Sequence, residues 1–127
     1  MLAKLKFTVA SLCWAVFALP GASAQPMPQV GGFPNQAIKF VSPFPAGGGN
    51  DGTTRLVTSR LSEIIGQSAV VDNRGGAGGN IGAKAVADAK PDGYTVLTGQ
   101  VSLMAVNPTL YASPGFDPIR NFVPITQ

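Results

Sequence analysis

The sequence predicts an α/β fold in which a parallel sheet lies between two layers of helices. Short apolar runs alternate with amphipathic runs, the connections between them are short, and two of these connections are rich in glycine. Consecutive strand–helix–strand units form right-handed parallel crossovers. This handedness favours a sheet that starts with the strand order 2-1-3.

The first residues have the composition of a secretory signal peptide. Lys4 and Lys6 make the start basic, residues 7–19 form an apolar run, and Ala22-Ser23-Ala24 has the small-x-small pattern of a cleavage site. The apolar run is shorter than the about 20 residues that a membrane span needs. We therefore expect a signal peptide at residues 1–24, cleavage after Ala24, a periplasmic location and a flexible leader at residues 25–36.

The composition of residues 25–127 excludes several functional classes. Without Lys4 and Lys6 the net charge of +3 falls close to neutrality, which gives no basic patch for nucleic acid. The chain has no histidine, and its one cysteine, Cys13, lies in the predicted signal peptide. Disulfides, thiol nucleophiles, imidazole bases and the usual zinc ligands are therefore absent after cleavage, and we expect neither an enzyme nor a metal or cofactor.

The first strand–helix unit begins at residue 37. Residues 37–42 read as a strand that Pro43 ends. After a glycine loop, an apolar face of Val57, Leu61, Ile64 and Ile65 predicts an amphipathic helix that ends at Gly66. Asp51 or Thr53 is expected to cap the start of this helix.

Two further strands follow. Residues 69–72 are apolar, as in a strand covered on both faces, and residues 94–98 form the third strand after a turn at residues 91–93. Between them, Ile81, Ala85, Val86 and Ala89 predict a helix with a small-residue face against the sheet. Residues 101–106 are expected to form one or two helical turns ended by Asn107-Pro108. Residues 122–126 resemble the start of a fourth strand in a domain that the sequence does not complete.

The two glycine loops, residues 43–51 and 73–80, carry the functional prediction. Each follows a strand, and parallel strands carry their carboxyl ends on one side of a sheet, so the free backbone N–H groups of both loops should meet at one edge. This arrangement suits an anion. For Asp51, a helix cap and a ligand contact both remain open, and Arg74 is interpreted as a solvated or loop-bracing side chain rather than a carboxylate clamp.

The first loop also matches a dinucleotide fingerprint. Gly47-x-Gly49-x-x-Gly52 is followed 20 residues later by Asp72, where a ribose-binding acid would stand. Against this reading, Pro43-Phe44-Pro45-Ala46 separates the strand from the glycines, and Asp51 places a carboxylate where pyrophosphate would lie. An exported dinucleotide-binding or oxidoreductase fragment therefore stays as the alternative, and a degenerate gene product without a stable fold is a third possibility.

A longer set of motifs resembles a known family. The motifs are Ile38-Lys39-Phe40-Val41, Pro43-Phe44-Pro45-Ala46-Gly47-Gly48 with Asp51, Leu61 with Gly66-Gln67, Val71 with Asn73-Arg74, Gly76-Ala77-Gly78-Gly79, Ala89 with Pro91-Asp92-Gly93-Tyr94-Thr95, Asn107-Pro108, Leu110-Tyr111 and Phe122-Val123-Pro124-Ile125. Together they resemble the substrate-binding proteins of tripartite tricarboxylate transporters, the Bug-type periplasmic solute-binding proteins.

The resemblance implies a type II periplasmic-binding-protein domain, truncated before the second domain of a clamshell. Such a protein captures a small organic carboxylate, for example a di- or tricarboxylate, an amino acid or an aromatic acid, and delivers it to the membrane permease subunits of its transporter. A monomer is expected. By this resemblance the ligand-binding residues would be Phe44, Pro45, Ala46, Gly47, Gly48, Asp51, Gly76, Ala77, Gly78, Gly79, Thr98 and Gly99.

Overall fold

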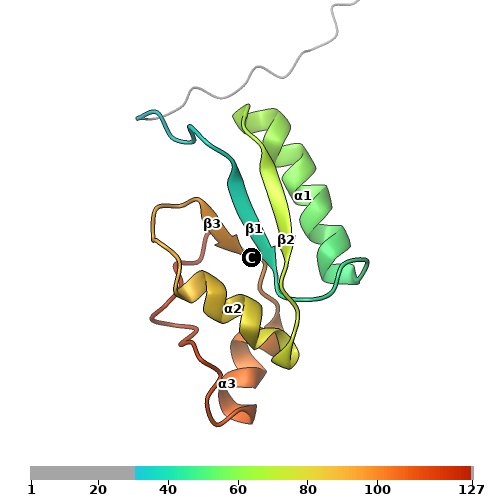
Figure 1. Ribbon diagram of the computed structural model, residues 1–127, viewed down its shortest axis with the longest axis vertical. Coiled ribbons are helices and arrows are strands. Elements are labelled where there is room, and N and C mark those ends of the chain that lie inside the picture. The colour runs from blue at the N-terminus through green and yellow to red at the C-terminus, as the bar shows by residue number, and fades with distance from the viewer. Residues whose placement is uncertain (1–30, 127) are drawn as a thin grey trace, which may run out of the picture.

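The computed structural model describes residues 31–126, so the predicted signal peptide and the first residues of the predicted leader lie outside the described residues. The strands β1 (Ile38–Ser42), β2 (Ala69–Asn73) and β3 (Thr95–Leu97) form one parallel sheet of order β2-β1-β3 (Figure 1). The predicted α/β class and strand order are confirmed. The helices are α1 (Gly49–Ile65), the 3-10 turn η1 (Ala77–Gly79), α2 (Asn80–Ala87), the π-helical segment η2 (Ser102–Val106) and α3 (Asn107–Leu110).

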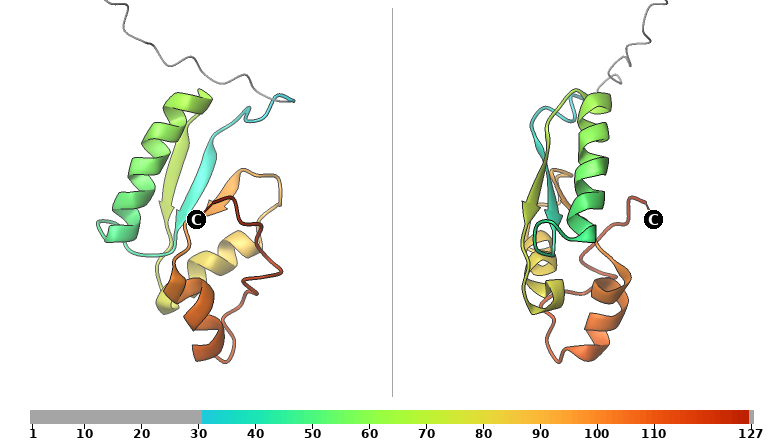
Figure 2. Two further views of the ribbon diagram at one scale, coloured as in Figure 1. Left: turned by 180° about the vertical axis from the view of Figure 1, so that it is seen from behind. Right: turned by 90° about the vertical axis from the view of Figure 1, so that its right-hand side faces the viewer.

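The two longer helices cover opposite faces of the sheet. Leu97 of β3 pairs with Val41 of β1 and packs against the cluster that contains Ala83 of α2. The next residue of β1, Ser42, points to the other face and donates from Oγ to Asn50 Oδ1 of α1 at 2.7 Å. Figure 2 shows α1 alongside the sheet and α2 with α3 near its carboxyl end. None of the helices in the described part is long and apolar enough to cross a membrane.

The predicted inner face of α1 is wrong in part. Val57 is 51% exposed, whereas the fully buried side chains of this helix are Asp51, Thr54 and Thr58. The two threonine hydroxyls donate to carbonyls of their own helix, Thr54 to Asn50 and Thr58 to Arg55, so their burial leaves no polar atom unpaired. The predicted stop at Gly66 is confirmed, because this residue is left-handed and its N–H donates to Ser62 O.

The second crossover also differs from its prediction. In α2 the buried residues are Asn80, Gly82 and Ala83, while Ile81 is 56% exposed. Gly82 sits so close to the chain that an added Cβ would lie 2.7 Å from Arg74 O and 2.9 Å from Pro43 Cα, so the helix approaches through its smallest residues. Val70 of β2 is 52% exposed, because this strand lies at an edge and is not covered on both faces.

The core lies between α2 and the segment that follows β3. Ala83, Leu103 and Phe116 are buried together, and Leu97 and Phe122 pack against them. The rings of Phe116 and Phe122 meet edge to face with centroids 5.8 Å apart. Residues 122–126 form no strand, contrary to the prediction, and Pro108 lies in the first turn of α3 instead of ending a helix.

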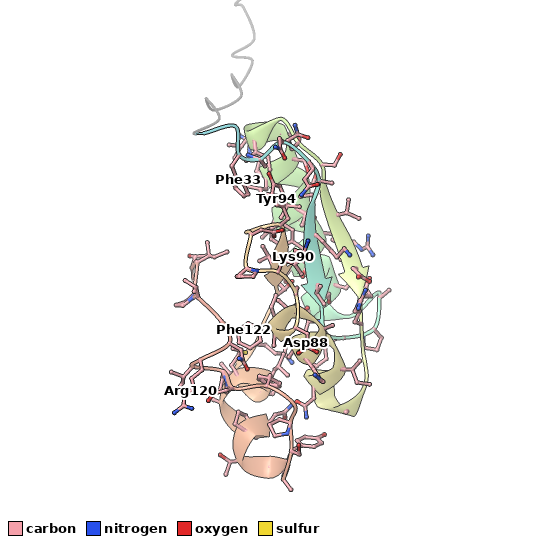
Figure 3. The ribbon with its side chains drawn as sticks, turned by 60° about the vertical axis from the view of Figure 1, so that its left-hand side comes forward. Phe33, Asp88, Lys90, Tyr94, Arg120 and Phe122 are labelled. Atoms are coloured by element: carbon pink, nitrogen blue, oxygen red, sulfur yellow. The ribbon has the colours of Figure 1, made fainter. Side chains whose placement is uncertain are left out.

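The described part of the predicted leader contacts the start of the third strand. Phe33 packs on Tyr94 with ring centroids 4.8 Å apart, as Figure 3 shows. The Tyr94 hydroxyl donates to Asn35 Oδ1 at 2.9 Å and accepts from the Asn35 N–H at 3.0 Å. Tyr94 is therefore a packing residue at the end of the sheet opposite the glycine loops.

Candidate functional site

The two glycine loops lie side by side at the carboxyl edge of the sheet. Asn73, the last residue of β2, donates from Nδ2 to the carbonyl of Phe44 in the first loop at 3.2 Å. Gly75 lies against Pro45, and Gly79 faces the Phe44 ring, since a Cβ at Gly79 would be 3.3 Å from Phe44 Cζ. The predicted meeting of the loops at one edge is therefore present in the fold.

Asp51 joins the two loops from below. Its carboxylate accepts the Gly47 N–H at 2.9 Å and Asn73 Nδ2–H at 2.9 Å, and Arg55 Nε pairs with it at 3.0 Å. The Arg55 hydrogen bond first, then those from Gly47 and Asn73, lower the pKa of Asp51 to about 2. Asp51 is 4% exposed, so its carboxylate lies inside the protein, where these three donors stabilise its negative charge.

The predicted capping role of Asp51 and Thr53 is wrong. Helix α1 begins at Gly49 with Gly48 as its N-cap, and no side chain caps it. Asp51 stands within the first turn and bonds back to Gly47, while the Thr53 hydroxyl donates to Gly49 O. The N-cap thus lies three residues before Asp51, and with glycine at this position no side chain bonds to the first-turn N–H groups.

The end of the third strand joins the same edge. Asn50 Nδ2 donates to Thr98 O at 3.2 Å, and Asn50 Oδ1 accepts from Ser42. The Thr98 hydroxyl donates to Val41 O, and the exposed Gly99 follows it. Asn50 thus fixes the residue after β3 to the residue that ends β1.

Backbone N–H groups are the main donors that this edge can offer. The first three N–H groups of a helix have no carbonyl partner within it, and in α1 these belong to Gly49, Asn50 and Asp51. They lie at the positive end of a 17-residue helix dipole. The edge is therefore suited to a small anion rather than a cation.

The second loop presents two more donors. Ala77 (φ 48°), Gly78 (φ 66°) and Gly79 (φ 96°) are all left-handed. The Gly76 carbonyl accepts the Gly79 N–H, and the Ala77 carbonyl accepts the Asn80 N–H. Since the C=O and N–H of a trans peptide point in opposite directions, the N–H groups of Ala77 and Gly78 face away from the turn.

The structure brings the sequence-predicted residues together at this edge. Phe44 is half-buried beneath the second loop, and residues 45–49 and 74–78 are exposed around it. Sequence reasoning missed the side chains that hold the loops, namely Asn50, Arg55, Asn73, Asn80 and Asn107. Asparagine at strand ends and at helix starts is the only sequence signal that pointed to most of them.

The groups that a dinucleotide would need are occupied. Asp72, the expected ribose acid, pairs with Arg74 at 2.8 Å, and the Gly47 N–H is used by Asp51. Arg74 therefore braces its own strand end while staying partly exposed to solvent, in line with the two roles expected for it. Within residues 31–126, no group of three His, Cys, Asp or Glu side chains is placed to hold a metal ion.

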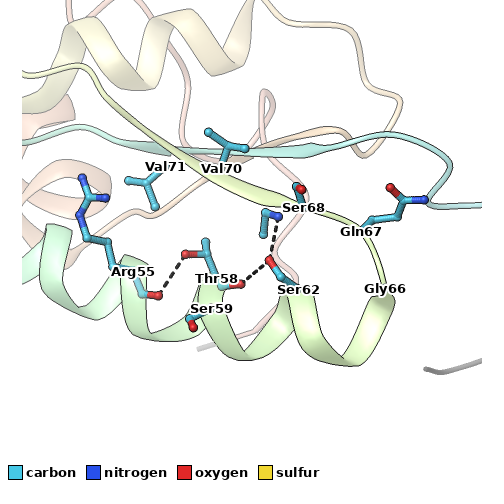
Figure 4. A pocket seen from close by; sticks show the side chains of 10 residues that line it. Arg55, Thr58, Ser59, Ser62, Gly66, Gln67, Ser68, Val70 and Val71 are labelled. Carbon is cyan, nitrogen blue, oxygen red and sulfur yellow. Dashed lines mark hydrogen bonds between the residues drawn. The ribbon is translucent and has the colours of Figure 1, made fainter. Parts of the chain in front are cut away.

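An open groove lies elsewhere on the molecule. It runs between α1 and β2 from Arg55 to Gly66 (Figure 4). The hydroxyls of Thr58 and Ser62 line it, but both donate to carbonyls of α1 itself, Thr58 to Arg55 O and Ser62 to Thr58 O. Ser62 Oγ also accepts the Ala69 N–H. This groove leads away from the glycine loops and contains none of the predicted ligand-binding residues.

Comparison with known proteins gives a family match and close structural neighbours. Residues 53–127 match the family described as the tripartite tricarboxylate transporter family receptor. A protein from Pseudomonas sp. strain P51, named UPF0065 protein in tcbD-tcbE intergenic region, is 43% identical over 93 residues. The match covers 73% of this chain and 27% of that protein.

Two solved structures share the fold. The periplasmic binding protein BugD matches with a TM-score of 0.68 and 38% sequence identity. The match covers 73% of this chain and 31% of the BugD chain. The R. palustris protein Rpa4515 with adipate has a TM-score of 0.66 and 44% identity, covering 68% of this chain and 29% of its own. The chain thus spans roughly a third or less of the length of the proteins it matches. The matching family is one of receptors and not of enzymes, which gives no support to the dinucleotide alternative.

Proposed function

Because the chain belongs to the tripartite tricarboxylate transporter receptor family, we propose that it supplies one wall of a periplasmic site for a small organic carboxylate. The observation that carries the proposal is the contact between the two glycine loops, made by Asn73 on Phe44 O and on Asp51. This contact ties the start of the second loop to the first loop and to the first turn of α1, and Asn50 ties the same turn to Thr98 O. The ligand-binding residues proposed from the sequence lie on these joined segments.

The chemistry of the edge favours a carboxylate over a neutral solute. Backbone N–H groups and the helix dipole both stabilise negative charge, and the one buried carboxylate beneath them, Asp51, is neutralised by Arg55. Adipate, the ligand named for Rpa4515, is a flexible dicarboxylate. We propose a ligand of this class, which the protein would deliver as a monomer to the membrane permease subunits of the transporter.

Affinity should be low in this chain. A binding site gains affinity by burying most of its ligand, and one loop-lined edge leaves the ligand largely in water. We expect binding of adipate near the millimolar range, about 4 kcal/mol.

A titration followed by amide NMR shifts tests the proposal. Adipate is added to the ¹⁵N-labelled protein, and 1,6-hexanediol, which has the same carbon chain without charge, is the control. Adipate should shift the amides of residues 46–51 and 75–79, and the diol should not. Equal shifts with the diol, or adipate shifts confined to the α1–β2 groove, would contradict the carboxylate site. Micromolar affinity by calorimetry would contradict the single-wall description.

The location is proposed together with the function. The solved relative BugD is described as a periplasmic binding protein, and we propose that the same compartment is reached here through a signal peptide cleaved after Ala24. Mass spectrometry of protein recovered from the periplasmic fraction should give a chain that starts at Gln25. A chain that keeps Met1 in that fraction would rule out this cleavage.

A further inference from the structure

A buried pair of asparagines lies behind the second glycine loop. Asn107, the first residue of α3, and Asn80, the first residue of α2, are each 5% exposed. Asn107 Nδ2 donates to Asn80 Oδ1 at 2.7 Å and to the carbonyl of Gly78 at 3.0 Å. One side-chain amide therefore joins the segment after β3 to the turn that precedes α2.

This amide closes the last open carbonyl of the turn. The carbonyls of Gly76 and Ala77 are bonded within the loop, to the N–H groups of Gly79 and Asn80. The Gly78 carbonyl is instead held by Asn107. The Gly76 and Ala77 carbonyls point into the turn, so the N–H groups of Ala77 and Gly78 are directed outward. The Gly78 carbonyl points the opposite way from the Gly79 N–H, and its bond to Asn107 fixes the third peptide plane of the turn.

The loop needs such a restraint because its backbone is strained. Ala77 has a φ of 48°, a region that residues with a Cβ rarely adopt, and two left-handed glycines follow it. Glycine has wide conformational freedom, so a loop of this composition would otherwise sample many orientations of the same N–H groups. Donors that are already oriented bind an anion more tightly than donors that must be ordered on binding.

The segment that carries Asn107 is itself firmly seated. Leu103 of η2 is fully buried, and a Cβ at Gly79 would lie 3.3 Å from its Cδ1, so η2 packs directly on the loop. The π-helical segment Ser102–Val106 leads directly into α3, whose first residue, Asn107, contacts the second glycine loop. A substitution in this segment would therefore move the N–H groups of the second loop, although the segment itself does not contact the ligand.

We propose that Asn107 is a positioning residue for the carboxylate site: it fixes the second glycine loop in the orientation that points the Ala77 and Gly78 N–H groups at the ligand. This inference rests on the proposed function. It assigns no ligand contact to Asn107 itself, which lies behind the loop. Asn80 acts with it as the acceptor that fixes the orientation of the Asn107 amide.

The test compares Asn107→Leu, which keeps the size of the side chain without its donors, with Asn107→Asp, which replaces the donating nitrogen by an acceptor. Phe116→Leu is the control, because it loosens the same core without removing a bond to the loop. Adipate affinity and amide shifts are measured by NMR for each protein, and the hydrogen exchange of the Gly79 amide reports the turn directly.

Both Asn107 variants should bind adipate about tenfold more weakly. Their adipate-induced shifts should be lost at Ala77 and Gly78 but kept at Gly49 and Asn50, and the Gly79 amide should exchange faster. Phe116→Leu should lower the melting temperature and keep the shifts at both loops.

The outcomes separate the two proposals. A wild-type protein that shows no adipate response overturns the proposed function and this inference with it. A wild-type response that both Asn107 variants retain at Ala77 and Gly78 overturns the positioning role alone. If Asn107→Leu does not fold, the result for Asn107→Asp decides. If Phe116→Leu loses the shifts at Ala77 and Gly78 as fully as the Asn107 variants do, the loss comes from general destabilisation and the positioning role is overturned.

Discussion

Asn73 and Asp51 are joined by a hydrogen bond of 2.9 Å from Nδ2 to Oδ1, although 22 residues separate them in the chain. Asn73 ends β2 and opens the second glycine loop, whereas Asp51 is the last residue of the first loop and lies in the first turn of α1. The bond makes the two loops one unit. Because Asp51 also accepts from Gly47 and pairs with Arg55, its carboxylate is the centre on which the geometry of the edge depends.

Replacing Asp51 by asparagine should therefore lower the melting temperature by several degrees. The amide has the shape of the carboxylate but loses its charge. Its NH2 group would face either Arg55 and the Gly47 N–H or the Asn73 amide, all of which are donors. Thermal unfolding followed by circular dichroism measures the effect. Glu63→Gln on the same helix breaks the exposed Arg60 pair and should change little. Equal losses in the two variants would contradict the central role of Asp51.

Stability should also fall at acid pH in a way that depends on Asp51. Its pKa is about 2 in the fold, held down by Arg55, Gly47 and Asn73, against the ordinary value of 3.8. A lowered pKa means that the ionised group stabilises the fold fully above 3.8. This contribution is lost as the pH falls from 3.8 through about 2. Asp51→Asn should thus lose less stability than the wild type between about pH 4 and pH 2.

Asp117 provides the control for this pH range. The N–H groups of Arg120 and Ile119 bond to its carboxylate and lower its pKa as well, but it lies far along the chain from the loops and is more exposed. Asp117→Asn should reduce the acid loss independently of Asp51→Asn, and the double variant should reduce it by the sum. Identical pH curves for the wild type and Asp51→Asn would show that the Asp51 network is not formed in solution.

The strands could be predicted from the sequence because their signal is local. The predicted strands at residues 37–42 and 69–72 are followed by proline and glycine loops and agree with β1 and β2 to within one residue, and the handedness of the crossovers then fixes their order. The helix faces could not be predicted in the same way. Hydrophobic periodicity points to Val57, but Thr54 and Thr58 are buried because their hydroxyls bond to carbonyls of α1 itself.

The position of the candidate site could be predicted, but the side chains that build it could not. Glycine loops after parallel strands must share an edge, which needs only topology. The hydrogen bond from Asn107 to Gly78 O joins residues that are 29 positions apart, and Asn107 is positioned by a π-helical segment that no sequence pattern predicts. The local sequence places Asp51 at the helix cap, because its bond to Asn73, 22 residues away, forms only in the fold.

The buried core should depend strongly on Leu103. Its side chain is fully buried between Ala83, Phe116 and the second loop, so Leu103→Ala should lower the free energy of unfolding by about 3 kcal/mol, within the usual range for such a cavity. Leu110→Ala is the matched control, because Leu110 is 71% exposed in the next helix. Urea unfolding measures both. A loss below about 1 kcal/mol for Leu103→Ala would mean that the segment after β3 is not packed as described.

The closeness of α2 to the loops gives the last prediction, for which the chain supplies its own control. A methyl group at Gly82 would lie 2.7 Å from Arg74 O and 2.9 Å from both Cα and Cβ of Pro43, all of them parts of rigid backbone or ring. Gly82→Ala must therefore push α2 away from the sheet edge and should cost about 1–3 kcal/mol in the free energy of unfolding.

Gly52→Ala makes the same chemical change in α1, where no atom lies within 4 Å of the added Cβ, and should raise the free energy of unfolding by about 0.5–1 kcal/mol through helix propensity. Urea unfolding of the two variants should thus give shifts of opposite sign. Because Gly82→Ala moves the start of α2, its amide spectrum should also change at residues 75–79, whereas the spectrum of Gly52→Ala should keep these signals in place. Shifts of the same sign and size in both variants would contradict the close approach of α2 to Pro43 and Arg74, on which the contact between the two loops depends.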